Sequence, residues 1–136
     1  MGNIAPIFSK VARVEWVNGI TAANTAKDGT GTVDTVFNAD ATNGSFLQKL
    51  IIRPRGTNVA SVLRVFVNNG ATNATASNNC MIGEVPLPAT TNSEVAALSG
   101  LEFALNLPLS PGEKILVTLG TAVAGGYAVS AWGGDY

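Results

Sequence analysis

The sequence predicts an all-β fold, an eight-stranded antiparallel β-sandwich with jelly-roll or Greek-key connections. Eight short apolar or alternating runs are separated by links rich in Asn, Gly, Thr and Ala, which favour turns. No segment keeps a helical period beyond two turns, so strands do not alternate with helices as a parallel sheet requires. With 136 residues, the chain is expected to form a single sandwich domain over residues 11–136, preceded by an N-terminal arm over residues 1–10.

The first five strands are predicted from runs rich in Val, Ile, Leu, Phe and Thr, because most of these residue types suit a pleated, half-buried surface. Links such as Asn68-Asn69-Gly70 separate the runs, since Asn and Gly tolerate the left-handed backbone of tight turns. The runs are residues 11–18 (VARVEWVN), 30–37 (TGTVDTVF), 46–53 (FLQKLIIR), 59–67 (VASVLRVFV) and 81–87 (MIGEVPL).

Residues 101–107 give the clearest strand, because large apolar side chains at every second position place one row in a core. The sequence Pro111-Gly112 that follows predicts a tight turn, so residues 101–107 and 114–119 are expected to form a hairpin. Residues 127–132 form the last predicted strand after a Gly-rich link. The predicted core contains Leu50, Ile52, Leu63, Val65, Leu101, Phe103, Leu105, Leu107, Ile115, Val117 and Leu119.

Two segments carry apolar side chains that this arrangement does not bury. In residues 59–67 both faces are apolar, and Val62 and Phe66 lie on the side opposite the core residues. Either this strand is central and covered on both faces, or its outer face meets another chain. The arm holds Ile4, Ile7 and Phe8 without a strand or helix period, so we expect it to order against a partner.

Other side chains are also interface candidates. Arg53 and Arg55 form the one local basic cluster, either a solvated strand end or a patch for an acidic partner. Trp132 and Tyr136 are candidates because aromatic residues are enriched in protein interfaces. Trp16 and Trp132 are alternatively a platform on which a sugar stacks, although two Trp residues in a sandwich of this size are more often core or interface anchors.

The composition argues against catalysis and against a bound metal. The chain has no His, the commonest general base and metal ligand, and the single Cys80 excludes a thiolate cluster and an internal disulfide. Cys80 is expected to be a small, at least half-buried side chain. Asp28, Asp34 and Asp40 are close enough in sequence to suggest a glycosidase pair, yet they are expected to be turn and edge residues. We therefore expect no enzyme, no catalytic residue, no metal, no cofactor and no small-molecule substrate.

The charge pattern narrows the choice of partners. Eight Lys and Arg stand against nine Asp and Glu with no run of one sign, which gives no reason to expect a nucleic acid or a membrane partner. Charged residues make up 12% of the chain, about half the usual share. Neighbouring copies therefore repel one another weakly, and self-association as a homodimer or homotrimer is expected.

The segments GTNVASVLRVFVNNG and PGEKILVTLGT are the most distinctive parts of a longer likeness that runs from Gly44 to Tyr136. This stretch resembles small proteins encoded among the capsid genes of tailed bacteriophages, in particular a jelly-roll cement, or head decoration, protein of a short-tailed phage. The likeness is weaker over residues 1–43. The resemblance implies binding to the outside of an icosahedral shell of the HK97-like fold, usually as symmetric oligomers, and it implies no catalytic residues.

This resemblance predicts a virion structural protein on the outer capsid surface, made in the host bacterial cytoplasm. Such a protein would hold neighbouring subunits of an HK97-like major capsid protein together. The alternative is a carbohydrate-binding β-sandwich module of a phage tail or a secreted enzyme, which requires Trp16 or Trp132 to be exposed.

Overall fold

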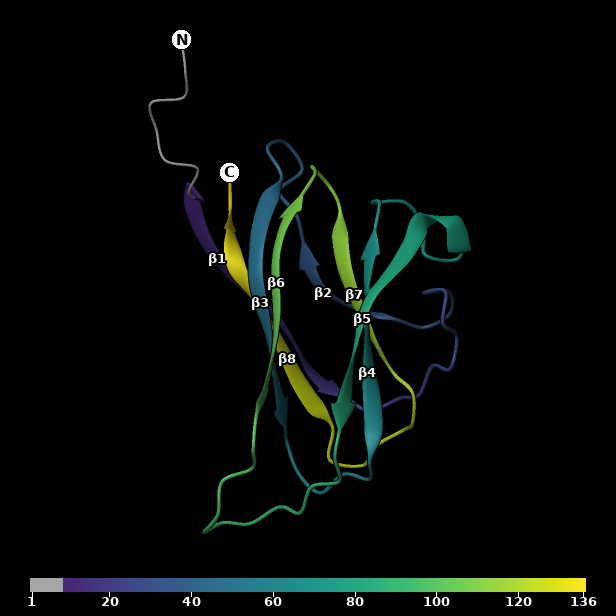
Figure 1. The fold of residues 1–136 in the computed structure, drawn as a ribbon, viewed down its shortest axis with the longest axis vertical. Helices are drawn as coiled ribbons and strands as arrows, with labels where there is room; N and C mark the ends of the chain where they lie inside the picture. Colours follow the sequence, from purple (N-terminus) through teal and green to yellow (C-terminus); the bar gives the residue numbers. More distant parts are fainter. Residues whose placement is uncertain (1–8) are drawn as a thin grey trace.

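The computed structural model describes residues 9–136, which form eight strands and one short 3-10 turn (Figure 1). The predictions for Ile4, Ile7 and Phe8 concern side chains outside the described residues. The elements are β1 (Val11–Ile20), β2 (Asp34–Asn38), β3 (Ser45–Pro54), β4 (Ser61–Asn68), η1 (Ala76–Asn78), β5 (Asn79–Leu87), β6 (Leu101–Leu109), β7 (Lys114–Leu119) and β8 (Tyr127–Asp135).

The strands form two four-stranded sheets, and every strand pair is antiparallel. Sheet A has the order β1-β8-β3-β6, and sheet B has the order β2-β7-β4-β5. The first strand pairs with the eighth, the second with the seventh, the third with the sixth and the fourth with the fifth. A long hairpin rolled up on itself gives this nested pairing, which is the jelly roll, so the predicted fold class is confirmed.

The turn after β6 crosses from one sheet to the other, so the predicted hairpin of residues 101–107 and 114–119 is wrong. β6 pairs with β3 in sheet A, whereas β7 pairs with β2 and β4 in sheet B.

The strand boundaries differ from the prediction by three or more residues at two places. Residues 30–33 do not join β2, because Gly29 and Gly31 have positive φ and the amide and hydroxyl of Thr30 both donate to Asp28 Oδ1. This local turn leaves only Asp34–Asn38 in the ladder with β7. The last strand instead runs three residues beyond the predicted 127–132, to Asp135, because β1 and β3 both pair with its end.

The core lies between the sheets and contains the predicted residues, although those of β6 are less buried than the rest. The predicted core residues of β3, β4 and β7 are 0% exposed. Those of β6 are only half-buried, because β6 is an edge strand beside the equally exposed edge strand β5. At this open side the Phe103 ring lies on the backbone of Gly83, where a Cβ would collide with the ring.

The outer face of sheet B is covered by the chain itself, which corrects the expectation for Phe66. Phe66 is 0% exposed and lies between Met81 and Leu116 in the register, so it offers no surface to a partner. Figure 1 shows the β1–β2 link reaching the side of the sheet where η1 lies. There Asn73 Nδ2 donates to the carbonyls of Gly29 and Gly31, at 3.0 and 2.8 Å. Of the two alternatives for this strand, the central and doubly covered one is therefore correct for Phe66.

Asn58 joins three links at the end of the sandwich away from the C-terminus (Figure 1). Asn58 is 3% exposed, and its Oδ1 accepts from the Gly126 amide at 2.8 Å. Its Nδ2 donates to the carbonyls of Gly56 and Gly126 and to the Thr90 hydroxyl, at 3.2 to 3.3 Å. Backbone bonds of 3.1 and 2.9 Å pair Asn58 with Thr90 as well. One buried amide thus fixes the links that follow β3, β5 and β7.

Asn58→Ala should lower the free energy of unfolding by about 1–3 kcal/mol, because the buried Gly126 amide and two carbonyls lose their partner. Asn58→Asp should recover only part of the loss, since a carboxylate accepts from Gly126 but donates nothing. Urea denaturation measures both, with the exposed Asn43→Ala as the matched control. A loss below about 0.5 kcal/mol for Asn58→Ala would contradict the role given to this side chain.

Candidate interaction surface

The outer face of sheet A carries three exposed apolar side chains on two neighbouring strands. Val14 and Trp16 of β1 are 49% and 67% exposed, and Trp132 of β8 is 42% exposed. Trp132 lies directly opposite Val14, while Trp16 lies opposite Ser130, two residues along. Diagonal neighbours in an antiparallel pair are about 7–8 Å apart, so both indoles belong to one surface. We call Val14, Trp16 and Trp132 the tryptophan patch.

Trp132 is held in place although it is exposed. Its Nε1 donates to Ser130 Oγ at 2.9 Å. Lys49 of β3 lies opposite Trp132, and its Nζ is 5.2 Å from the centroid of the indole, within cation–π range. Lys49 Nζ also pairs with Glu102 at 3.3 Å. An aromatic anchor fixed in this way loses little side-chain freedom when it binds a partner.

Two shallow hollows lie on either side of β1. The first, of about 470 Å³, is on the outer face of sheet A; we call it the Ala12 hollow. The second, of about 430 Å³, runs along the free edge of β1 toward β2; we call it the edge groove. The Ala12 hollow is lined by Ser9, Ala12, Arg13, Val14, Phe46, Gln48, Trp132 and Gly133, and the edge groove by Val14, Glu15, Trp16, Thr35, Val36 and Asn38.

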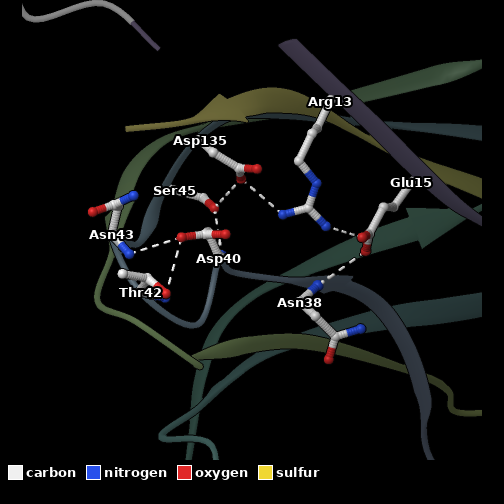
Figure 2. Close-up of polar contacts among 8 residues, drawn as sticks. All are labelled: Arg13, Glu15, Asn38, Asp40, Thr42, Asn43, Ser45 and Asp135. Carbon is white, nitrogen blue, oxygen red and sulfur yellow. Dashed lines mark hydrogen bonds and ion pairs between the residues drawn. The ribbon is translucent and has the colours of Figure 1, made fainter. Parts of the chain in front are cut away.

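A polar network on the inner side of β1 links the two sheets (Figure 2). Arg13 pairs with Asp135 of β8 at 2.8 Å and with Glu15, and its guanidinium carbon is 4.6 Å from the centroid of the Phe37 ring. Glu15 Oε2 accepts from the Asn38 amide of β2 at 3.0 Å. The network thereby ties β1 and β8 of sheet A to β2 of sheet B at the edge of the sandwich.

Asp135 extends the network to β3 and to the loop before it. Ser45 Oγ donates to Asp135 Oδ1 at 2.6 Å and accepts from the Asp40 amide at 2.9 Å. Burial raises the pKa of Asp135, but the hydrogen bond from Ser45 and the bond and charge of Arg13 outweigh it, so the pKa lies below its ordinary value. The folded state therefore holds Asp135 as a carboxylate.

The three aspartates considered for catalysis do not share a cleft. Asp28 closes its own turn with Thr30, whose hydroxyl and amide lower the pKa of the carboxyl. Asp34 begins β2, where burial raises its pKa. The Asp40 carboxylate accepts the amides of residues 42 and 43 in the loop before β3. The carboxylates of Asp28 and Asp40 thus close local turns, and the expectation that the chain is not an enzyme stays a prediction.

Within residues 9–136, no group of three or more Cys, Asp or Glu residues is placed to hold a metal ion. The described part of the chain also contains no helix long and apolar enough to cross a membrane. Cys80 of β5 is exposed, contrary to the expectation that it is at least half-buried, because it lies on an edge strand.

The predicted interface residues do not form one surface. Arg53 and Arg55 are exposed at the end of β3, and each lies against a different backbone, at Gly100 and Gly19 respectively. Neither arginine forms an ion pair within the part of the chain that the structure describes. Whether they form a solvated strand end or a patch for an acidic partner stays a prediction.

The remaining candidates lie on three different parts of the molecule. Val62 is half-buried on the outer face of sheet B, where the nearby Phe66 is covered. Tyr136 is half-buried beside the loop before β3, and its amide donates to the Gly44 carbonyl at 3.2 Å. Trp132 alone belongs to the tryptophan patch.

Val14 is not among the predicted interface residues, and Trp16 is predicted as a core or interface anchor or as part of a sugar-binding platform. Alternation in VARVEWVN favours burying Ala12, Val14 and Trp16 and exposing Arg13 and Glu15, but the structure has the opposite arrangement. Arg13 and Glu15 face inward because each has partners there. The sequence gives little sign that Arg13 and Glu15 face inward, because Asp135, the partner of Arg13, comes close to it only after folding.

Comparisons with known proteins add no family to this description. No protein-family model matches the chain, and no curated protein matches it. One similar solved structure is dimeric latent PorU from Porphyromonas gingivalis, with 14% identity and a TM-score of 0.36 over 98% of this chain and 14% of that chain. Another is the Gt strain of infectious bursal disease virus, with 17% identity and a TM-score of 0.32 over 92% of this chain and 32% of that chain. The chain thus spans a third or less of each of these chains, and neither likeness indicates a function.

The stability of the protein should fall in acid through Asp135. Because its folded pKa is below the unfolded value of about 3.9, the carboxylate stabilises the fold at neutral pH, and this contribution is lost as the pH falls from about 4 through the folded pKa. Asp135→Asn should cost about 1.5–3 kcal/mol at pH 7, the usual worth of hydrogen bonds to a charged group. The difference between the two proteins in chemical denaturation should shrink as the pH falls below about 4. A constant difference between them across pH 2–7 would contradict the assignment.

Proposed function

We propose that the protein is a virion structural protein, a cement or head decoration protein that binds the outside of an icosahedral phage capsid. The exposed tryptophan patch on the outer face of sheet A is the observation that supports this proposal. A rigid sheet with aromatic anchors on one outer face suits attachment to a second protein surface. In this role the protein joins neighbouring subunits of the major capsid protein and is made in the host bacterial cytoplasm.

The anchors resemble the centre of a protein interface more than its rim. Trp residues dominate the binding energy of many interfaces, particularly where polar neighbours exclude water around them. Trp132 has such neighbours in Lys49, Ser130 and Gln48, all on the same face of sheet A. The net charge of −1 adds little long-range repulsion against either sign of partner.

Attachment to a lattice also tolerates a modest interface. A specific contact needs only about 800 Å² on each partner. When one molecule contacts two shell subunits, the second contact becomes intramolecular and retention rises without new interactions. A jelly roll with a fixed outer face supplies the rigidity that such bridging requires.

The test is retention on capsids. Purified protein should bind expanded shells of the phage that encodes it, and mass spectrometry of virions should find it as an abundant component. Trp132→Ala should weaken retention at least tenfold, since an aromatic anchor at an interface centre is worth about 2 kcal/mol or more. The matched control is Val59→Ala, because Val59 is 57% exposed in the β3–β4 link, away from the patch. Equal retention of both variants, or scarcity of the protein in virions, would contradict the proposal.

A carbohydrate-binding module is the second candidate function, because sugar stacking requires an exposed indole and both indoles are exposed on one face. Aromatic faces stack on sugars, and Glu102, Lys49 and Gln48 offer polar groups nearby. Binding of the wild-type protein on a glycan array, lost in both Trp16→Ala and Trp132→Ala, would favour this function. Retention on capsids without glycan binding would favour the first.

A further inference from the structure

β1 is an edge strand whose outer backbone edge is free. On one side it pairs with β8 from Val11 to Asn18 without interruption, and the bulge at Gly19 comes only after this stretch. Among the described residues, no backbone hydrogen bond joins the other edge of residues 11–18 to another segment. Proteins usually protect such an edge with Pro, Lys, a bulge or inward-pointing charges, because it is a template for another strand. Residues 11–18 contain no Pro, no Lys and no bulge, and their two inward charges, Arg13 and Glu15, are of opposite sign and can pair with those of a second copy.

We propose that the free edge of β1 pairs with β1 of a second copy, antiparallel and about a two-fold axis at Val14. This register places Arg13 opposite the partner's Glu15, and Glu15 opposite the partner's Arg13. Opposite charges in such cross-strand pairs are stabilising, and like charges are destabilising. The axis also gives the closed, two-fold contact that is commonest among homo-oligomers.

Neighbouring registers are disfavoured by charge and by the alternation of side chains. Shifting the axis by one residue to Arg13 or to Glu15 places like charges directly opposite each other. An axis between two residues instead puts the core face of one copy beside the solvent face of the other. An axis at Val14 places opposite charges opposite each other and keeps the core faces of the two copies on the same side.

The register also fills the Ala12 hollow. Trp16, the most exposed residue of the tryptophan patch, comes to lie opposite the partner's Ala12. Ala12 itself is opposite Gly134 in β8, against which the Ser9 side chain lies, so only small side chains form the floor beneath the partner's indole. The hollow of about 470 Å³ beside Ala12 is lined by Val14, Phe46 and Trp132. A Trp side chain buries about 150–250 Å² when it is covered, so two symmetric insertions supply a substantial interface core.

The dimer joins two copies of sheet A into one eight-stranded sheet with both tryptophan patches on the same face. Val14 pairs with the partner's Val14 at the centre, and Trp132 of each copy lies one strand outward. A molecule of this shape presents two copies of any binding surface on that face. The inference itself does not rest on the proposed function, since pairing of β1 needs no capsid and no glycan.

Sedimentation velocity of the full chain between 1 and 100 µM tests the proposal. The wild type should sediment as a species of twice the 13.9 kDa chain mass. Val14→Lys should shift it to the monomer, with at least tenfold weaker association, because two ammonium groups meet at the axis. Val59→Lys, the same change at an exposed site elsewhere, should stay dimeric. A wild-type monomer at 100 µM, or a dimer that survives Val14→Lys, overturns the proposal.

Disulfide trapping tests the register in a Cys80→Ser background. Val14→Cys should form a covalent dimer on mild oxidation, because directly opposed residues have Cα atoms about 4.5–5.5 Å apart, within disulfide range. Ala12→Cys, on the same strand and the same face, should not, since it lies opposite the partner's Trp16 rather than its own equivalent. Equal trapping of the two variants would refute the axis at Val14. If the wild-type protein is a dimer but binds neither capsids nor glycans, the proposed functions are contradicted and the dimer is not.

Discussion

The inward position of Arg13 determines which face of β1 meets the solvent. Its guanidinium lies between Asp135 and Glu15 and over the Phe37 ring, where β1, β8 and β2 meet at the edge of the sandwich. An outward Arg13 would leave the partly buried carboxylates of Asp135 and Glu15 without their cation, which is costly. Because successive side chains in a strand alternate, an inward Arg13 forces Val14 outward. The tryptophan patch and the Ala12 hollow follow from this one placement.

Most of the fold was predictable because it depends on patterns that act locally. Alternating leucines and a Pro-Gly turn locate β6, β7 and the turn between them, but the predicted hairpin is wrong because β6 pairs in sheet A and β7 in sheet B. The absence of helical periods left two packed antiparallel sheets as the fold class. The half-burial of Phe103 was not predictable, because alternation tells which way a side chain points and not whether its strand lies at an edge. Strand order is a property of the whole chain.

The surface was harder to predict because it depends on contacts between distant segments. Residues 59–67 are apolar on both faces, which fits an interface at Phe66, yet Phe66 is 0% exposed, and the β1–β2 link is bonded to Asn73 of the β4–β5 link. Trp16 lies in a run whose pattern favours burying it, and Asp135, 122 residues beyond Arg13, reverses that preference. In both cases the deciding partner is distant along the chain. A local conflict between pattern and placement is often a sign of a functional surface, and β1 is where this conflict occurs.

Hydrogen bonds at both ends of the sandwich hold the strands that carry the outer face of sheet A. At one end Asn58 binds three links, and at the other Asp135 and Ser45 hold β8, β3 and the loop before β3. Neither set of bonds touches the tryptophan patch, yet both limit how far sheet A can bend beneath it. A surface that keeps its shape loses little entropy on binding, and most of its contact energy then appears as affinity. In the proposed dimer this matters twice, because two patches act together only if the sheet between them stays flat enough for both to reach their targets.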